Sequence, residues 1–378
     1  MAAAGLTQDK RIRCTGCNAK LRLPAGTDPS MLRCPRCGTP VQELIGAKGT
    51  TSMEDGRKVI AGYRLTRKIA RGGMGVVYEC KGPKDDGPYA IKVMSDAARD
   101  NPECVIRFKR EGRIGMLIDH PAVVSTFVCD EADGQLPYMV MELIDGVDMS
   151  RLVKAEGAMP WRRAVDYAIQ VAGALAVMGE LGVVHRDIKP QNILIAKNDR
   201  AKLADFGLAK HIGDDDGVVE EDGVLTVTGT QMGTPAYMPP EQIDDSVRVS
   251  PAADVYSLAA TLYHLVTGQR PFPGKGAVKV MEKVLYDEPQ RPKTIVKDVP
   301  PALDELIMWC LEKNARLRPP NGVAMEGLLR LVRQRPEDVQ AVRDARGTLA
   351  RRGSSRLLLA LVLVLVPLIA VGLFMLLL

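Results

Sequence analysis

Two short stretches of this chain carry a distinctive set of polar side chains: His185-Arg186-Asp187-Ile188-Lys189-Pro190-Gln191-Asn192 and, thirteen residues after Asn192, Asp205-Phe206-Gly207. A carboxylate can accept the proton of an attacking hydroxyl, and a lysine can neutralise charge that develops on a phosphoryl group. A second carboxylate and an amide oxygen can hold magnesium against phosphates. The two stretches therefore predict phosphoryl transfer by four residues: Asp187, Lys189, Asn192 and Asp205.

A glycine-rich segment upstream predicts a strand, a turn and a second strand: Ile69-Ala70-Arg71-Gly72-Gly73-Met74-Gly75-Val76-Val77-Tyr78. Backbone N–H groups approach phosphate closely only where side chains are absent, which explains the glycines. A glycine-rich hairpin alone is more often a plain turn. The next strand, Tyr89-Ala90-Ile91-Lys92, favours the phosphate interpretation because it places Lys92 on the opposite face from Ile91.

Taken in order, these motifs resemble the bacterial members of the eukaryotic-like (Hanks-type) serine/threonine protein kinases. The resemblance covers roughly residues 63–331. It implies an α+β, bilobal protein kinase fold with a small β-rich lobe over a larger helical lobe and ATP between them. It also implies that Asp187 deprotonates the acceptor hydroxyl, and that Lys189 stabilises the transferring phosphoryl. Asn192 and Asp205 would bind Mg²⁺ or Mn²⁺.

The resemblance further assigns the groups that hold ATP. Lys92 would position the α- and β-phosphates and be held by Glu111, which lies in a predicted amphipathic helix over residues 102–117. Residues of the connection between the lobes would supply the gatekeeper, the backbone that faces adenine and the contact to the ribose. The whole expected set is Ile69, Ala70, Arg71, Gly72, Gly73, Met74, Gly75, Val76, Val77, Ala90, Lys92, Met141, Glu142, Ile144, Asp148 and Leu194. Ala70 replaces the first glycine of the family pattern G-x-G-x-x-G-x-V, and ATP binding is still expected.

The segment after Asp205 bears on acceptor class and regulation. Lys189 and Thr234 are the family's markers for serine and threonine acceptors, and Pro239-Pro240-Glu241 stands where the family has Ala-Pro-Glu. Glu241 is expected to pair with Arg318, and Asp254 to brace the catalytic loop. Thr226 and Thr228 are expected sites of autophosphorylation, because Arg186 could pair with a phosphorylated loop residue.

Four of the eight cysteines predict a metal site near the N-terminus. Cys14, Cys17, Cys34 and Cys37 form the pattern C-x₂-C-x₁₆-C-x₂-C, which is typical of four thiolates on one structural Zn²⁺. The residues between the pairs are long enough for a β-hairpin, and so small a segment would fold around its metal. It resembles a zinc ribbon. Disulfides and an iron site with identical ligands are the alternatives.

Basic residues surround this predicted ribbon: Lys10, Arg11, Arg13, Lys20, Arg22, Arg33 and Arg36. A nucleic-acid role is less favoured because no aromatic residue is present there for base stacking. A protein partner or a structural role is the preferred interpretation.

Residues 357–378 predict a single transmembrane helix, since all twenty-two are uncharged. A helix of that length spans about 33 Å, enough for a bilayer core of about 30 Å. A buried core helix is the less favoured alternative. Arg351, Arg352 and Arg356 precede it, so the positive-inside rule places the kinase in the cytoplasm, on the cell membrane.

The sequence thus predicts a zinc ribbon over residues 1–45, a linker over 46–61, a kinase domain over 62–332, a basic juxtamembrane segment over 333–356 and the anchor over 357–378. The expected function is a membrane-anchored kinase that transfers the ATP γ-phosphate to serine and threonine hydroxyls of protein substrates. Autophosphorylation of the activation loop, in a homodimer, is the expected route of activation. The alternative is a pseudokinase scaffold that recruits partners through the ribbon.

Overall fold

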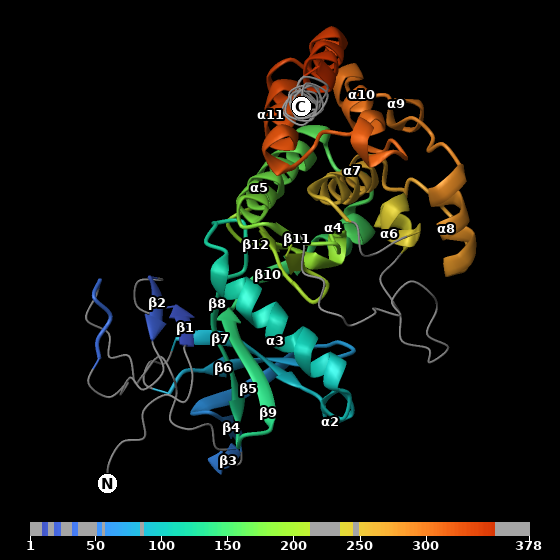
Figure 1. Cartoon of the computed structure of the whole chain (residues 1–378). Helices are drawn as coiled ribbons and strands as arrows, with labels where there is room; N and C mark the ends of the chain where they lie inside the picture. Colours follow the sequence, from blue (N-terminus) through green and yellow to red (C-terminus); the bar gives the residue numbers. More distant parts are fainter. Residues whose placement is uncertain are drawn as a thin grey trace, which may run out of the picture.

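The computed structural model describes residues 10–13, 19–23, 32–36, 51–54, 57–83, 87–211, 235–244 and 249–351. A lobe built on one curled β-sheet with helix α3 (Pro102–Leu117) beside it adjoins a larger lobe of helices (Figure 1). This confirms the predicted α+β, bilobal architecture.

The N-terminal sheet has seven strands in the order β3-β4-β5-β6-β7-β9-β8. Every neighbouring pair is antiparallel. The strands are β3 (Thr51–Glu54), β4 (Arg57–Ile60), β5 (Tyr63–Arg71), β6 (Gly75–Lys81), β7 (Pro88–Met94), β8 (Thr126–Ala132) and β9 (Leu136–Glu142). Alternate residues of these strands point into one core, which includes Ile60, Tyr63, Ile91 and Val140. Short helix α2 (Asp96–Arg99) precedes α3, which begins where the Asn101 side chain accepts from Glu103 N at 2.9 Å.

The structure differs from the expectation of a linker over residues 46–61. Strands β3 and β4 lie in this range and extend the sheet beyond β5. The sheet curls so far that Thr51 N, at one end of the strand order, donates to Asp133 Oδ2 in the β8–β9 turn at 2.9 Å. The pair Asp55-Gly56, a strong hairpin signal in a sequence, could have indicated these strands.

The helical lobe is organised around α7 (Pro251–Thr267), which is buried along most of its length. Helices α5 (Trp161–Glu180) and α11 (Gly322–Gln334) pack closely because Gly322 has no side chain; a Cβ there would lie 2.3 Å from Ala176 N. The other helices are α4 (Met149–Glu156), α6 (Pro240–Asp244), α8 (Ala277–Tyr286), α9 (Pro292–Ile295) and α10 (Pro301–Cys310), with 3-10 turns η2 (Pro190–Asn192), η4 (Pro235–Tyr237) and η6 (Ala315–Leu317). Short strands β10 (Gly146–Asp148), β11 (Val183–Val184), β12 (Ile193–Ala196), β13 (Ala201–Leu203) and β14 (Lys210–His211) lie on the side toward the sheet.

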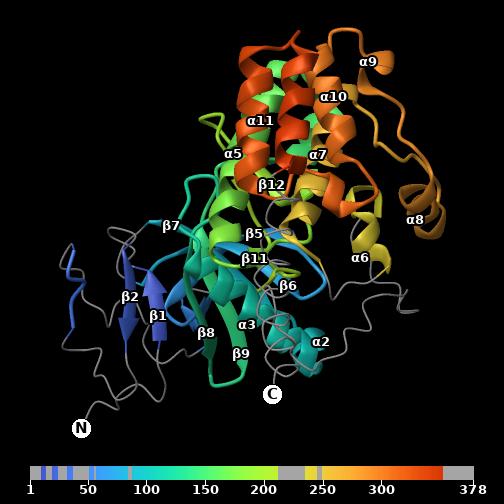
Figure 2. The same cartoon turned by 45° about the horizontal axis from the view of Figure 1, so that its top comes forward.

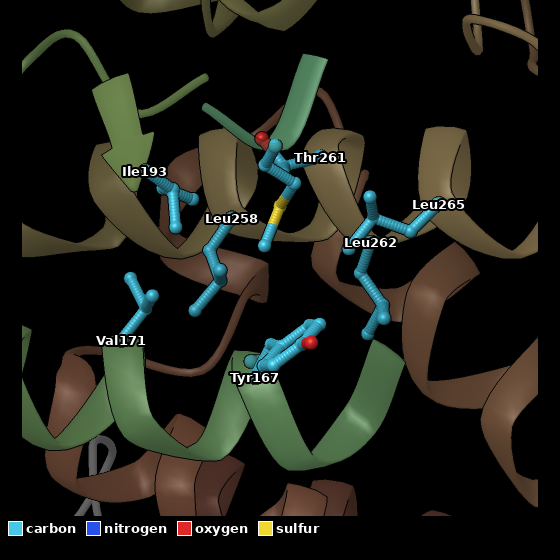
Figure 3. Close-up of a pocket in the computed structure, with 9 residues that line it drawn as sticks. Tyr167, Val171, Ile193, Leu258, Thr261, Leu262 and Leu265 are labelled. Carbon is cyan, nitrogen blue, oxygen red and sulfur yellow. The ribbon is translucent and has the colours of Figure 1, made fainter. Parts of the chain in front are cut away.

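A small apolar pocket lies between α5 and α7 (Figure 3). Its lining is aliphatic or aromatic apart from the Thr261 hydroxyl, which has no hydrogen-bond partner among the described residues. The lining residues are Met149, Tyr167, Ala168, Val171, Ile193, Leu258, Thr261, Leu262 and Leu265. Because it contains no charged group, it is a feature of core packing and carries no chemistry.

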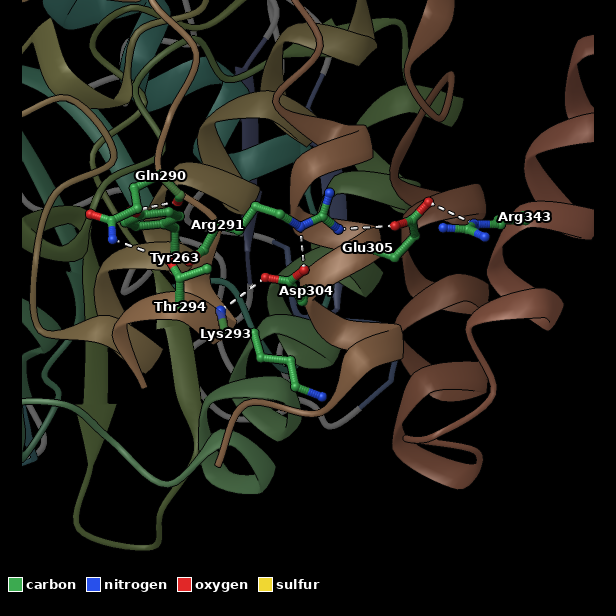
Figure 4. A network of polar contacts seen from close by, with 8 residues as sticks. All are labelled: Tyr263, Gln290, Arg291, Lys293, Thr294, Asp304, Glu305 and Arg343. Atoms are coloured by element: carbon green, nitrogen blue, oxygen red, sulfur yellow. Dashed lines mark hydrogen bonds and ion pairs between the residues drawn. The ribbon is translucent and has the colours of Figure 1, made fainter. Parts of the chain in front are cut away.

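The range expected as a juxtamembrane segment is partly a folded part of the helical lobe. Residues 339–351 are helical, and Val342 is buried in the main core. Arg343 donates to Glu305 of α10 at 3.1 Å, and Glu305 also accepts from Arg291, as Figure 4 shows. Arg291 in turn donates to Asp304 at 2.7 Å. Glu305 of α10 therefore neutralises Arg343, one of the basic residues in the range 333–356.

Within the part of the chain that the structure describes, no helix is long and apolar enough to span a bilayer. The expected anchor, residues 357–378, lies outside the described residues.

The N-terminal module is described in part. Strands β1 (Lys10–Arg13) and β2 (Lys20–Leu23) pair antiparallel, with the first cysteine pair between them in the sequence. Most of the stretch between the two cysteine pairs, where a hairpin was expected, lies outside the described residues. Cys34 is buried, whereas Cys14, Cys17 and Cys37 lie outside the described residues. No group of metal-binding side chains occurs among the residues that are described.

Candidate active site

Asp254 of α7 hydrogen-bonds the backbone of the loop that carries Asp187. The Asp254 carboxylate is 3 % exposed and accepts from His185 N at 2.8 Å and from Arg186 N at 2.9 Å. Arg186 has a φ of +67°, a conformation that non-glycine residues seldom adopt without external support. The two buried hydrogen bonds supply that support, and they fix the backbone immediately before Asp187.

Asp187, Lys189 and Asn192 form one hydrogen-bonded group. Lys189 Nζ lies 2.8 and 2.7 Å from the two carboxylate oxygens of Asp187. Asn192 Nδ2 donates to Asp187 O at 2.9 Å and to Asp187 Oδ2 at 2.8 Å. The 3-10 turn η2 brings Asn192 back to the start of the loop, and Pro190 suits the first position of that turn. The Asp187 side chain is therefore oriented from two sides.

Lys92 on β7 and Glu111 on α3 form a buried ion pair. Lys92 Nζ lies 2.6 and 2.7 Å from the two oxygens of Glu111, and the side chains are 15 % and 5 % exposed. Burial disfavours the charged form of Lys92, but the carboxylates of Glu111 and Asp205 outweigh this effect, so the pKa of Lys92 is raised. The lysine is thus kept as a cation.

Asp205 faces the same cation from the other lobe, with its Oδ1 3.9 Å from Lys92 Nζ. Half of its side chain is exposed, and protein atoms enclose the rest. That enclosure opposes ionisation, yet the charge of Lys92 and, to a lesser extent, the N–H of Gly207 lower the pKa of Asp205. Its φ is +64°, and Gly207 leaves space for the carboxylate because a Cβ there would lie 3.2 Å from Asp205 Oδ1. An ionised carboxylate and the oxygen of Asn192 are a donor set suited to Mg²⁺.

The side chains of Phe206 and His185 pack against each other in the interior. The two rings are 5.2 Å apart between centroids, and both side chains are buried. Burial lowers the pKa of His185, so its imidazole is neutral at pH 7.

The glycine-rich turn connects β5 to β6 and has Gly72 N donating to Gly75 O at 2.9 Å. Ala70 pairs with Val77 inside the strands, where extended backbone suits any residue. Ala70 follows a register shift between Lys68 and Ala70, and the strands still pair at Ala70 and Arg71. Gly75 has a further structural role, because a Cβ on it would lie 2.3 Å from Val93 O on β7. The expected ATP residues from Ile69 to Val77 all lie on this hairpin.

The other expected ATP residues come from four strands and one connecting loop. Ala90 and Lys92 lie on β7, with Ala90 opposite Met141 on β9. Glu142 ends β9, and Ile144 follows it in the connection to β10. Asp148 ends β10 and pairs in register with Leu194 on β12.

Two of these side chains have partners that the sequence interpretation missed. Asp148 caps α4 by accepting from Arg151 N at 3.1 Å, so part of its carboxylate is used within the helix start. Glu142 binds Lys202 Nζ on β13 at 2.8 Å. An aspartate directly before a predicted helix is an N-cap signal that could have indicated the first contact; no sequence pattern indicates the second.

The end of the activation segment is attached to the helical lobe. Glu241 accepts from both terminal nitrogens of Arg318, at 2.7 and 2.8 Å. Gln242 Nε2 donates to Arg186 O at 3.0 Å, a contact to the catalytic loop that no sequence pattern indicated. Tyr237 hydrogen-bonds His264 at 2.6 Å, and burial lowers the pKa of His264 to about 4. Thr226, Thr228 and Thr234 lie outside the described residues.

Comparison with known families supports what the geometry indicates. The model of the protein kinase domain family matches residues 63–328 of this chain, which is more than half of its length. The chain belongs to the protein kinase family. The matched range ends before the helix at residues 339–351.

Several bacterial kinases are similar in sequence to this one. They include serine/threonine-protein kinase PknA of Mycobacterium tuberculosis, 37 % identical over 260 residues, which are 68 % of this chain and 58 % of that protein. PknB of Mycolicibacterium smegmatis is 35 % identical over 292 residues, 76 % of this chain and 45 % of that protein. PknL of Mycobacterium tuberculosis is 35 % identical over 264 residues, 70 % of this chain and 63 % of that protein. The chain therefore spans less than two thirds of the length of each.

The Lys92–Glu111 pair generates a prediction about pH. In Glu111→Gln, the charge that offsets burial is lost, so the pKa of Lys92 should fall and the lysine should lose its proton as pH rises. Mg–ADP affinity, measured by calorimetry at pH 7 and pH 9, should then weaken with pH by up to about tenfold more than in the wild type, which corresponds to about one pKa unit. Glu103→Gln, an exposed position on the same helix, is the control and should behave as wild type. Parallel pH profiles for all three proteins would contradict the role of Glu111.

Proposed function

We propose that this kinase transfers the γ-phosphoryl group of ATP to serine and threonine hydroxyls of proteins. One observation carries the proposal: Asp187 is held by Lys189 and Asn192, while Lys92 is held by Glu111 and lies 3.9 Å from Asp205. Lys92 and Glu111 come from the N-terminal lobe and the other four residues from the helical lobe, and together they are the protein side chains that the reaction requires.

Each side chain of the site has a separate role in the transfer. Asp187, with a carboxylate oriented by Lys189 and Asn192, receives the proton of the acceptor hydroxyl as the oxygen attacks. Lys189 places its ammonium beside the developing charge, and Lys92 holds the α- and β-phosphates. Asn192 and Asp205 would hold magnesium, which neutralises phosphate charge when bound. The buried support from Asp254 limits how far Asp187 can move, which favours a near-attack geometry.

Two features support serine and threonine as acceptors. Lys189 follows the base by two residues, and Thr234 follows Gly233 in the activation segment; both match the serine/threonine pattern of the family. The similar bacterial proteins PknA, PknB and PknL are serine/threonine-protein kinases by name. A pseudokinase scaffold is less favoured, because each catalytic position is occupied by the required residue and Ala70 still pairs with Val77 across the hairpin.

The proposal predicts the behaviour of Asp187→Asn. Without a carboxylate to accept the proton, transfer from radiolabelled ATP to a generic protein acceptor should fall at least about 100-fold. Mg–ADP binding should persist, because Lys92, Glu111 and Asp205 remain in place. Asp298→Asn, an exposed carboxylate in the helical lobe, is the matched control and should transfer at the wild-type rate. Equal transfer by Asp187→Asn and the wild type would refute the enzymatic assignment.

Activation is proposed to depend on autophosphorylation of Thr226 and Thr228, with a homodimer as the arrangement that allows it. Arg186 supports this, since its backbone is fixed beside Asp187 and its cation could bind a phosphorylated loop. Mass spectrometry of the recombinant wild type and of Asp187→Asn tests this proposal. Phosphate that persists on these threonines in Asp187→Asn would rule out autophosphorylation.

A membrane location is proposed from residues 357–378, whose apolar length matches a bilayer. The kinase would then act on the cytoplasmic face of the cell membrane. Fractionation should find the full chain in the membrane pellet and a chain ending at residue 356 in the soluble fraction. A full chain that stays soluble would refute the anchor.

A structural zinc ion is proposed for the four thiolates, and a protein partner for the module that contains them. The spacing of the cysteines supports the metal, and the β1–β2 hairpin around the first pair is consistent with a ribbon. Metal analysis of the full chain should find about one zinc ion per molecule. Cys34→Ser should lose it, while Cys104→Ser, on α3, should keep it. Iron in its place, or no metal, would refute the assignment.

A further inference from the structure

The carboxyl end of α3 meets a lysine from the N-terminal hairpin. The last turn of this helix, Ile114–Leu117, contains no basic residue, although a helix terminus carries partial negative charge on its free carbonyls. Lys20 Nζ, on β2, donates to Leu117 O at 2.5 Å. A residue ninety-seven positions away in the sequence therefore supplies the cation that the helix itself lacks.

The hairpin also lies against the strand that supports α3. Strand β1 contacts both α3 and β8. Figures 1 and 2 agree in placing β1 and β2 beside the β8 side of the sheet, in two views that differ by 45°. The hairpin thus spans the seam between α3 and the sheet.

That seam has no spare room, because two glycines of α3 face β8. A Cβ on Gly112 would lie 2.3 Å from Cys129 Sγ, and a Cβ on Gly115 would lie 2.4 Å from Thr126 Oγ1. Glu111 directly precedes Gly112 on the helix. Because Glu111 reaches Lys92 only while α3 is seated on β8, the seating of α3 controls the ion pair.

We propose that Lys20 is a positioning residue for phosphoryl transfer: it holds the carboxyl end of α3 on β8, and this keeps Glu111 on Lys92. The N-terminal module would thereby couple its own state to the catalytic centre. The consequence for catalysis rests on the proposed kinase function, whereas the seating of α3 does not.

Cys129 is a natural reporter for the seating of α3. Burial, and to a lesser extent Glu111, raises the pKa of its thiol to about 12, so it reacts slowly with an alkylating reagent while α3 covers it. In the full-length Lys20→Met protein, alkylation of Cys129, quantified by peptide mapping, should become about two- to fivefold faster, the range expected from loss of a cation at a helix carboxyl end. Phosphoryl transfer should decrease by no more than the same factor.

Three comparisons make the result specific. Lys20→Arg retains the cation and should restore the slow rate, and Lys58→Met, which removes an exposed lysine from β4, should leave it unchanged. Cys310 is buried in the helical lobe, so an unchanged Cys310 rate excludes general unfolding. Equal Cys129 rates in the wild type and Lys20→Met would overturn the proposal. If Lys20→Met speeds the labelling of Cys129 but the wild type itself transfers no phosphate, the seating of α3 by Lys20 is supported and only the kinase function is refuted.

Discussion

The ion pair between Lys92 and Glu111 is the interaction on which the arrangement of the N-terminal lobe depends. Both side chains are almost fully buried, so either charge alone would be strongly destabilised. The pair can form only if α3 is seated on the sheet, and Gly112 and Gly115 allow that close seating. Asp205 brings the second lobe to the same cation. One electrostatic requirement therefore couples a strand, a helix and a loop from separate parts of the chain.

In the helical lobe, buried hydrogen bonds and an ion pair fix the polar groups in place. Asp254 is buried and satisfies two consecutive backbone N–H groups, so Arg186 can keep a left-handed backbone next to Asp187. Arg318 is likewise buried and binds Glu241, which attaches the end of the activation segment to α7 and its neighbours. In each case a rigid, buried element positions an exposed one, which is the requirement for a preorganised site.

Much of the site could be predicted from the sequence because its residues lie in short ordered motifs. The group at 185–192, the triplet at 205–207 and Lys92 were predicted as parts of one centre, and the structure places them together. Glu111 was assigned to Lys92 from the resemblance to the kinase family, and the structure places the two side chains in contact. The prediction of a linker over residues 46–61 was less successful, because the strand pair there is short and gains its stability from pairing with β5. The helix at 339–351 was missed because the range was interpreted as a basic juxtamembrane segment, yet Arg343 and Arg346 bind Glu305 and Glu312 of the helical lobe.

By itself, the sequence determined the kinase family, the identity of the reactive groups and their assignment to phosphoryl transfer, since these depend on residue types at close spacing. It also determined the cysteine pattern and the apolar terminal segment. Only the tertiary structure decided that Gly75 is needed for contact with β7 and that Lys20 lies at the end of α3. These contacts join residues through space, and no local periodicity encodes them. They arise because the curled sheet brings its ends, the N-terminal hairpin and α3 into one compact lobe.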